Sequence, residues 1–256
     1  MRLDETVGVK AWVRLGLLML LVLSPCAAVA AGPQWTASWG SAQLKPSPGD
    51  SLPSKVFEGA TLRQVVHLSA GGARMRLHLS NAFGESVLVL RAVRVGKGKD
   101  GVVVHFNGET GVSIPAGAEY VSDPITVSVS ALSDVVVSMM IEKAPETLTF
   151  HSGARATSFL VRGDHVGNEV FEAPQTFAHW YFLAGVEVEK NAAAVVAFGD
   201  SITDGHGATT DGNDRWTDVL ARRLAGKVGV VNAGIGGNCI LEDGCGRDSR
   251  GAGWGI

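Results

Sequence analysis

Alternation of apolar and polar residues is the main pattern between residues 33 and 190. The segment 73–80, ARMRLHLS, places an apolar residue at every second position. Successive side chains of a β-strand point to opposite faces, so this period of two predicts a half-buried antiparallel strand. Similar runs predict strands at 62–68, 87–95, 101–106, 125–129, 135–141, 157–161 and 186–189.

Glycine-rich turns separate these predicted strands. The chain contains 33 glycines among 256 residues, against an average share of about 7%. They follow no Gly-X-Y repeat, and many lie in short segments such as 71–72, 96–101 and 115–117, which are typical of turns. Short strands joined by turns, with no helical stripe between them, predict a β-sandwich or jelly-roll domain over residues 31–190.

The pattern changes after Lys190. Residues 192–198, AAAVVAF, form a continuous apolar run, as expected for a parallel strand that is covered on both faces. Apolar residues then recur at helical spacing in 215–224, and a second buried strand is predicted at 228–232. This order predicts the start of a flavodoxin-like α/β domain over residues 191–256, with functional residues at the carboxyl ends of its strands.

Only 66 residues follow Lys190, which is room for two strands where a sheet of this type needs about five. With only two strands, the sheet would expose apolar edges at Val195, Val196, Val230 and Val231. The sequence therefore predicts an incomplete α/β domain.

Composition excludes several classes of protein. The chain has 22 basic and 25 acidic residues, a net charge of −3, and 46% hydrophobic residues. It is too apolar for a disordered chain and lacks the basic excess of a nucleic-acid binder. Three cysteines without a CxxC, HExxH or Cys/His cluster indicate neither a disulfide scaffold nor a metal site. We expect no metal and no cofactor. A disulfide between Cys239 and Cys245 stays open, as does the oligomeric state.

The first thirty residues are typical of a secretory signal peptide. Basic residues precede the apolar run 15–23, and the small residues at 28–30 fit a cleavage site. Cleavage after Ala30 predicts a secreted or periplasmic protein that begins at Ala31. The alternatives are a membrane anchor, which needs about 18 or more apolar residues, and lipidation at Cys26, which Pro25 disfavours.

Two short motifs carry a specific resemblance. GDSIT at 199–203 follows the first buried strand, and NAGIGGN at 232–238 closes the second. Together they resemble the first two conserved blocks of the GDSL, or SGNH, esterases. The segments SLPSKVFEGATLRQVVHLSAGG at 51–72 and RMRLHLSNAFG at 74–84 resemble the β domain of the acetylxylan-esterase-like branch, so the likeness covers most of the mature chain.

The resemblance implies a role for each matching residue. Ser201 would be the nucleophile of a cofactor-free hydrolysis of carboxylic esters through a seryl acyl-enzyme, including acetyl groups on plant polysaccharide. The backbone N–H groups of Ser201 and Gly237 would form the oxyanion hole, each such donor contributing about 3–4 kcal/mol. Glycine suits the second place, because a Cβ would crowd the substrate. Asp200 and Asn232 would support the two turns through hydrogen bonds.

The sequence departs from the family pattern in the remaining catalytic residues. The family takes an asparagine from a GxND block and its Asp and His from a DxxH segment, and neither follows Gly237 here. His206, the sole histidine after Lys190, lies five positions after Ser201, where the family has no catalytic base. We therefore expect a chain that is truncated after the second block and inactive or nearly so.

The Gly- and Arg-rich residues from about 241 onward also lack helical periodicity. A shifted reading frame would produce such a sequence, and we would then expect the missing blocks in another frame of the downstream DNA. A flexible natural tail and a fragment cut for convenience are the alternatives.

A different class of function stays open beside the esterase. A secreted, non-catalytic β protein could bind carbohydrate through Trp35, Trp39, Trp180 and Tyr181, although buried aromatics are the commoner outcome. The loop that bears Ser201 could also belong to a flavodoxin-like binder. The histidines at 67, 78, 105, 151, 165 and 179 show no ligand spacing and are expected to be surface or hydrogen-bonded strand residues.

Overall fold

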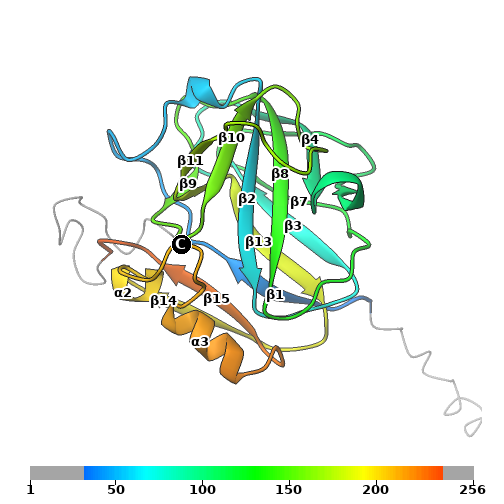
Figure 1. Ribbon diagram of the computed structural model, residues 1–256, viewed down its shortest axis with the longest axis vertical. Helices are drawn as coiled ribbons and strands as arrows, with labels where there is room; N and C mark the ends of the chain where they lie inside the picture. Colours follow the sequence, from blue (N-terminus) through cyan, green and yellow to red (C-terminus); the bar gives the residue numbers. More distant parts are fainter. Residues whose placement is uncertain (1–31, 239–256) are drawn as a thin grey trace, which may run out of the picture. The chain divides into compact units, whose positions relative to one another are not determined.

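The computed structural model describes residues 32–238. The predicted signal peptide, Cys239, Cys245 and the segment from residue 241 onward lie outside the described residues. The described residues from Pro33 on belong to one compact unit, in which a β-rich part precedes a small α/β part (Figure 1). The division at Lys190 stays a prediction.

The β-rich part contains thirteen strands and two 3-10 helices within the described residues. The strands are β1 (Trp35–Gly40), β2 (Ala60–Leu68), β3 (Met75–Ser80), β4 (Leu88–Val95), β5 (Val102–Val103), β6 (Val112–Ile114), β7 (Glu119–Val121), β8 (Ser133–Lys143), β9 (Phe150–Ser152), β10 (Ser158–Arg162), β11 (Gln175–Phe177), β12 (His179–Tyr181) and β13 (Leu183–Glu189). The 3-10 helices are η1 (Ser54–Val56) and η2 (Gly98–Asp100).

Two antiparallel sheets form the sandwich. One has the strand order β1-β13-β3-β7, and the other has the order β11-β10-β2-β8-β4-β5, with β6 beside β4. Strands β9 and β12 pair separately. Apolar side chains from both larger sheets meet in one core, including Leu62 and Val66 of β2 and Leu77 of β3. The sequence alternation in 73–80 is thereby explained: Leu77 is fully buried, and Arg76 on the other face pairs with Glu187 at 2.6 Å.

The α/β part has two strands and two helices within the described residues. They are β14 (Ala194–Gly199), α2 (Ser201–Asp204), α3 (Trp216–Arg223) and β15 (Gly229–Gly234). Strands β14 and β15 run parallel from the pair Ala194 and Gly229 to the pair Gly199 and Gly234. The fold class is confirmed in outline, as a β-rich domain followed by an α/β segment.

The sandwich covers part of the α/β segment. Strand β15 lies beside β1 (Figure 1), and the hydroxyl of Ser69 accepts a hydrogen bond from the Val230 N–H at 2.8 Å. Val230 is buried and Val231 is half-buried, so the exposed edge predicted for these two residues is wrong. The reason is the contact with β1, which the apolar pattern of the segment alone does not contain.

Three other predictions about local structure are corrected. Residues 125–129 form no strand but make isolated bridges to Gly72 and Met75. The strand predicted at 101–106 is shortened to two residues of β5. The run 192–198 is not covered on both faces, because Val196 and Phe198 are 61% and 45% exposed. Within residues 32–238, no helix or sheet packs over the face of β14 that carries Val196 and Phe198, as their exposure shows.

Candidate functional site

The two family-like motifs meet at the carboxyl ends of β14 and β15. The carbonyl oxygen of Gly199 accepts a hydrogen bond from the N–H of Ile235 at 3.0 Å. A Cβ on Gly234 would lie 2.2 Å from the backbone nitrogen of Asp204, so only glycine lets the end of α2 approach β15 this closely. The parallel pairing therefore places the GDSIT turn next to the NAGIGGN turn.

Ser201 opens helix α2, directly after the end of β14. The Asp200 carboxylate caps this helix by accepting a hydrogen bond from the N–H of Ile202 at 2.9 Å. The carbonyl oxygen of Ser201 accepts hydrogen bonds from the N–H groups of Gly205 and His206, at 3.0 and 2.8 Å. Within residues 32–238, no group hydrogen-bonds to the Ser201 hydroxyl. The turn positions the serine, but no described side chain takes its proton.

Gly237 and Asn232 lie on the neighbouring turn and strand. Gly237 has a φ of +76°, in the left-handed region, and a Cβ at this position would meet open space. Its glycine is therefore required by backbone conformation, and the space beside it is free for a ligand. The Asn232 amide donates to the carbonyl oxygen of Thr203 at 2.7 Å and to the Thr217 hydroxyl at 3.1 Å. Asn232 thus ties β15 to both helices.

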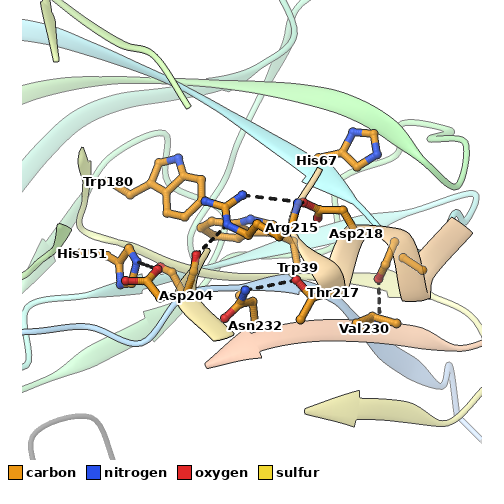
Figure 2. A pocket seen from close by; sticks show the side chains of 14 residues that line it. Trp39, His67, His151, Trp180, Asp204, Arg215, Thr217, Asp218, Val230 and Asn232 are labelled. Atoms are coloured by element: carbon orange, nitrogen blue, oxygen red, sulfur yellow. Dashed lines mark hydrogen bonds and ion pairs between the residues drawn. The ribbon is translucent and has the colours of Figure 1, made fainter. Parts of the chain in front are cut away.

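A buried contact between a histidine and an aspartate, which sequence reasoning missed, joins the sandwich to this corner. The Nε2 atom of His151, on β9, lies 2.9 Å from Oδ1 of Asp204 at the end of α2 (Figure 2). The other Asp204 oxygen, Oδ2, accepts a hydrogen bond from the N–H of Gly236 at 3.2 Å. The two residues of the pair are 53 positions apart, and no local pattern links them, so only their burial in the fold reveals the contact.

A small cavity with a mixed polar and apolar lining lies between the sandwich and the α/β segment (Figure 2). Its volume is about 30 Å³, and its lining includes Trp39, His151, Trp180, Asp204 and Arg215. A space of this size holds one or two water molecules, whereas sites for organic ligands start at about 300 Å³. An ester must therefore approach Ser201 from elsewhere, and these side chains serve to hold the segments together.

Arg215 is the buried cation beside this cavity. Its guanidinium donates to the carbonyl oxygen of Asp204 at 2.8 Å and to that of Ala154 in the sandwich. Burial lowers the pKa of Arg215, and the nearby carboxylates of Asp218 and Asp204 oppose that shift. The Trp180 ring lies 5.5 Å from the guanidinium carbon. Arg215 therefore links α2 to the β-rich part.

The loop between α2 and α3 has further anchors on the sandwich. The Asp211 carboxylate accepts hydrogen bonds from the N–H and hydroxyl of Thr157, both at 2.6 Å. The Asn213 amide donates to Oδ1 of Asp134 at 3.2 Å, and its nitrogen lies 3.1 Å from Nδ1 of His67. Nδ1 of His206 faces Nη2 of Arg155 at 3.3 Å. These contacts fix the loop that follows Ser201.

The aromatic residues proposed as a carbohydrate platform are mostly buried. Trp39, Trp180 and Tyr181 are inside the protein, and Trp35 is half-buried with Arg76 against its ring at 4.4 Å. They therefore do not form the open aromatic surface that a sugar ring stacks upon.

The described residues show neither a metal centre nor a membrane span. Among residues 32–238, no group of three or more His, Cys, Asp or Glu side chains is arranged to hold a metal ion. In the same part of the chain, no helix is long and apolar enough to cross a membrane.

Comparison with protein families assigns the segment that carries this corner. Residues 195–251 match the model of the family described as GDSL-like Lipase/Acylhydrolase. This segment is similar to that family. The matched residues begin in β14 and include Ser201 and Gly237, so the family assignment and the geometry concern the same two turns.

Comparisons with whole proteins give only a distant similarity. No curated protein matches the sequence significantly. Among solved structures, the chain is similar to an acetyl xylan esterase (Est2A) from the rumen bacterium Butyrivibrio proteoclasticus, with 12% sequence identity and a TM-score of 0.20. The similarity covers 82% of this chain and 48% of that chain. The present chain therefore corresponds to about half the length of that esterase.

Proposed function

We propose that the GDSL-type segment hydrolyses carboxylic esters, with Ser201 as the nucleophile. The Ser201 oxygen attacks the carbonyl carbon, the ester C–O bond breaks, and the alcohol leaves with the serine proton. Water then attacks the acyl-serine, releases the carboxylic acid and returns the proton to the serine. The observation that carries this proposal is the adjacency of the two family-matched turns at the ends of β14 and β15.

The backbone N–H groups of Ser201 and Gly237 are the proposed oxyanion donors. A tetrahedral intermediate carries negative charge on its oxygen, and fixed N–H donors stabilise that charge. The exposed, left-handed Gly237 supports this role, because its backbone lies open beside the turn.

Among the described residues, no general base is oriented toward the Ser201 hydroxyl. His206 follows Ser201 closely, but Arg155 lies against its Nδ1 atom, and its side chain makes no hydrogen bond with Ser201 among the described residues. Without an oriented base, the residual rate rests on binding and on the oxyanion donors. We therefore propose that the 256-residue chain is slow or inactive by itself.

The proposed substrates are acetyl esters, including acetylated polysaccharide. Support comes from the likeness of residues 51–72 and 74–84 to the acetylxylan-esterase-like branch. We further propose that residues 1–30 direct export to the periplasm or the medium. Acetate release from acetylated xylan tests the substrate, and N-terminal sequencing of exported protein should start at Ala31. Material that starts at Met1 would contradict export with cleavage.

The central experiment measures covalent labelling of Ser201 by a fluorophosphonate, together with turnover of p-nitrophenyl acetate. Ser201→Ala should abolish both signals, because it removes the attacking oxygen. Ser54→Ala is the matched control, since Ser54 is also half-buried but lies on η1 of the sandwich. Equal labelling of wild type and Ser201→Ala would overturn the assignment. Wild-type turnover at the rate of a complete esterase would instead refute the proposed slow rate and direct attention to His206.

A further inference from the structure

We propose that His151 is a positioning residue: acting through Asp204, it holds the NAGIGGN turn in register with Ser201. This inference rests on the proposed function, since it assigns the sandwich a part in that same site. In this proposal, the β-rich domain holds the reacting groups in position.

The surroundings of His151 fix its ring from three sides. The ring is 3% exposed and stacks on Trp180 with a centroid distance of 5.7 Å. Nδ1 lies 2.7 Å from the carbonyl oxygen of Ala42, and Nε2 lies 2.9 Å from Oδ1 of Asp204. A carbonyl and a carboxylate only accept hydrogen bonds, so a ring that satisfies both donates from both nitrogens. The buried Asp204 carboxylate therefore has a hydrogen-bond donor on the sandwich side.

Asp204 connects the two motifs. It is the fourth residue of α2, and its N–H donates to the carbonyl oxygen of Asp200 at 2.9 Å. Its carboxylate accepts from His151 through Oδ1 and from the N–H of Gly236 through Oδ2. One side chain thus spans the helix that begins with Ser201 and the turn that contains Gly237.

Gly236 immediately precedes Gly237, the proposed oxyanion donor. A donor is effective only when it lies about 2.7–3.1 Å from the oxyanion, and a displacement of about 1 Å can cost much of the rate. Loss of the His151 ring leaves the Asp204 carboxylate without its hydrogen-bond donor on the sandwich side. The carboxylate then turns toward water or Arg215 and releases the Gly236 N–H, which frees the turn.

The first measurement does not depend on turnover. Hydrogen exchange at the Gly236 amide, read by NMR on the 256-residue chain, should be at least about tenfold faster in His151→Leu, because a protecting hydrogen bond is lost. His151→Gln keeps a donor toward Asp204 and should restore protection. His179→Leu is the matched control, because His179 lies on the paired strand β12 and contacts Phe150 and Phe177. It should leave Gly236 unchanged.

The second measurement is the kinetics of fluorophosphonate labelling at Ser201. His151→Leu should lower the maximal rate constant by about tenfold and leave the half-saturating concentration unchanged, because the reacting geometry changes and the access to the serine does not. His151→Gln should recover most of this rate.

The outcomes separate this inference from the proposed function. Unchanged Gly236 exchange in a folded His151→Leu protein, or equal acceleration in His179→Leu, would overturn the positioning role. If His151→Leu does not fold, His151→Asn takes its place, because its shorter amide does not reach Asp204. Labelling that does not depend on Ser201 would overturn the proposed function, while the exchange experiment would still decide whether His151 holds the turn.

Discussion

The sandwich and the α/β segment bury their apolar strands to different extents. In the sandwich, β2 pairs with β8 over nine residues, and the inward residues of both strands lie in one core. In the α/β segment, β14 has one partner and exposes Val196 and Phe198. The sandwich is stabilised by its own core, which Ile235 of the α/β segment joins. The segment with Ser201 is also held by polar contacts to the sandwich. Stability and candidate chemistry thus reside in different parts of the same compact unit.

The largest expected effect comes from cutting the polar link between the two parts. Arg215→Met should lower the free energy of unfolding by about 4 kcal/mol, because two buried carbonyl groups lose charge-assisted hydrogen bonds. Chemical denaturation measures this loss. Arg223→Met, on the exposed end of α3, should change stability little. Equal effects of the two substitutions would show that the buried link does not stabilise the segment.

Truncating apolar residues tests the difference in burial directly. Leu77→Ala in the sandwich should cost about 3 kcal/mol, because it leaves a cavity in a closed core. Val196→Ala in β14 should cost less than about 0.5 kcal/mol, since its side chain is mostly in water. Urea midpoints of the two variants provide the comparison. A large cost at Val196 would mean that this face is covered in solution.

The close contact of α2 with β15 is a smaller but sharper test. Gly234→Ala should lower stability by about 2 kcal/mol, because the new Cβ would push the end of α2 away from the strand. Gly167→Ala, where a Cβ meets open space, is the control and should be neutral. Thermal unfolding of both proteins measures the difference, and a neutral Gly234→Ala would contradict the tight packing at this point.

The titration of Tyr181 at high pH measures how well the sandwich buries its hydroxyl. Burial raises the pKa of its hydroxyl from 10.0 to about 12. Between these values the unfolded chain ionises and the folded chain does not, so this contribution to stability is present below pH 10 and is lost as the pH rises through about 12. Absorbance at 295 nm should show a late-titrating tyrosine that Tyr181→Phe removes. Complete titration near pH 10 in the folded protein would contradict the burial.

The sequence predicted the parts of the fold that depend on local periodicity. The alternation in 73–80 gave the correct faces of β3, and GDSIT with NAGIGGN gave two turns that the structure places together. Short strands such as β9 and β12 were missed, because three residues carry too little pattern. The sequence predicted exposure at Val196 from the small number of strands, but it missed the burial of Val230, because an apolar run predicts a strand and leaves its neighbours unspecified.

The contact between His151 and Asp204 shows which part of the site the sequence did not predict. The sequence predicted an ordinary strand residue at His151 and no role for Asp204, which lies one position after GDSIT. The contact joins residues 53 positions apart through the packing of β9 on α2, which depends on the assembled fold. Local residue patterns identified the turns, but the side chains that hold them required three-dimensional structure.

The pairing of β1 with β13 sets the order in which the chain can fold. Trp35 pairs with Glu189, so β1 can pair only after a strand more than 150 positions later is available. Contacts of this length make folding slow, on the order of milliseconds to seconds. Strand β15 packs against β1 and therefore docks only on a nearly finished sandwich. The corner that contains Ser201 is consequently one of the last parts of the molecule to form.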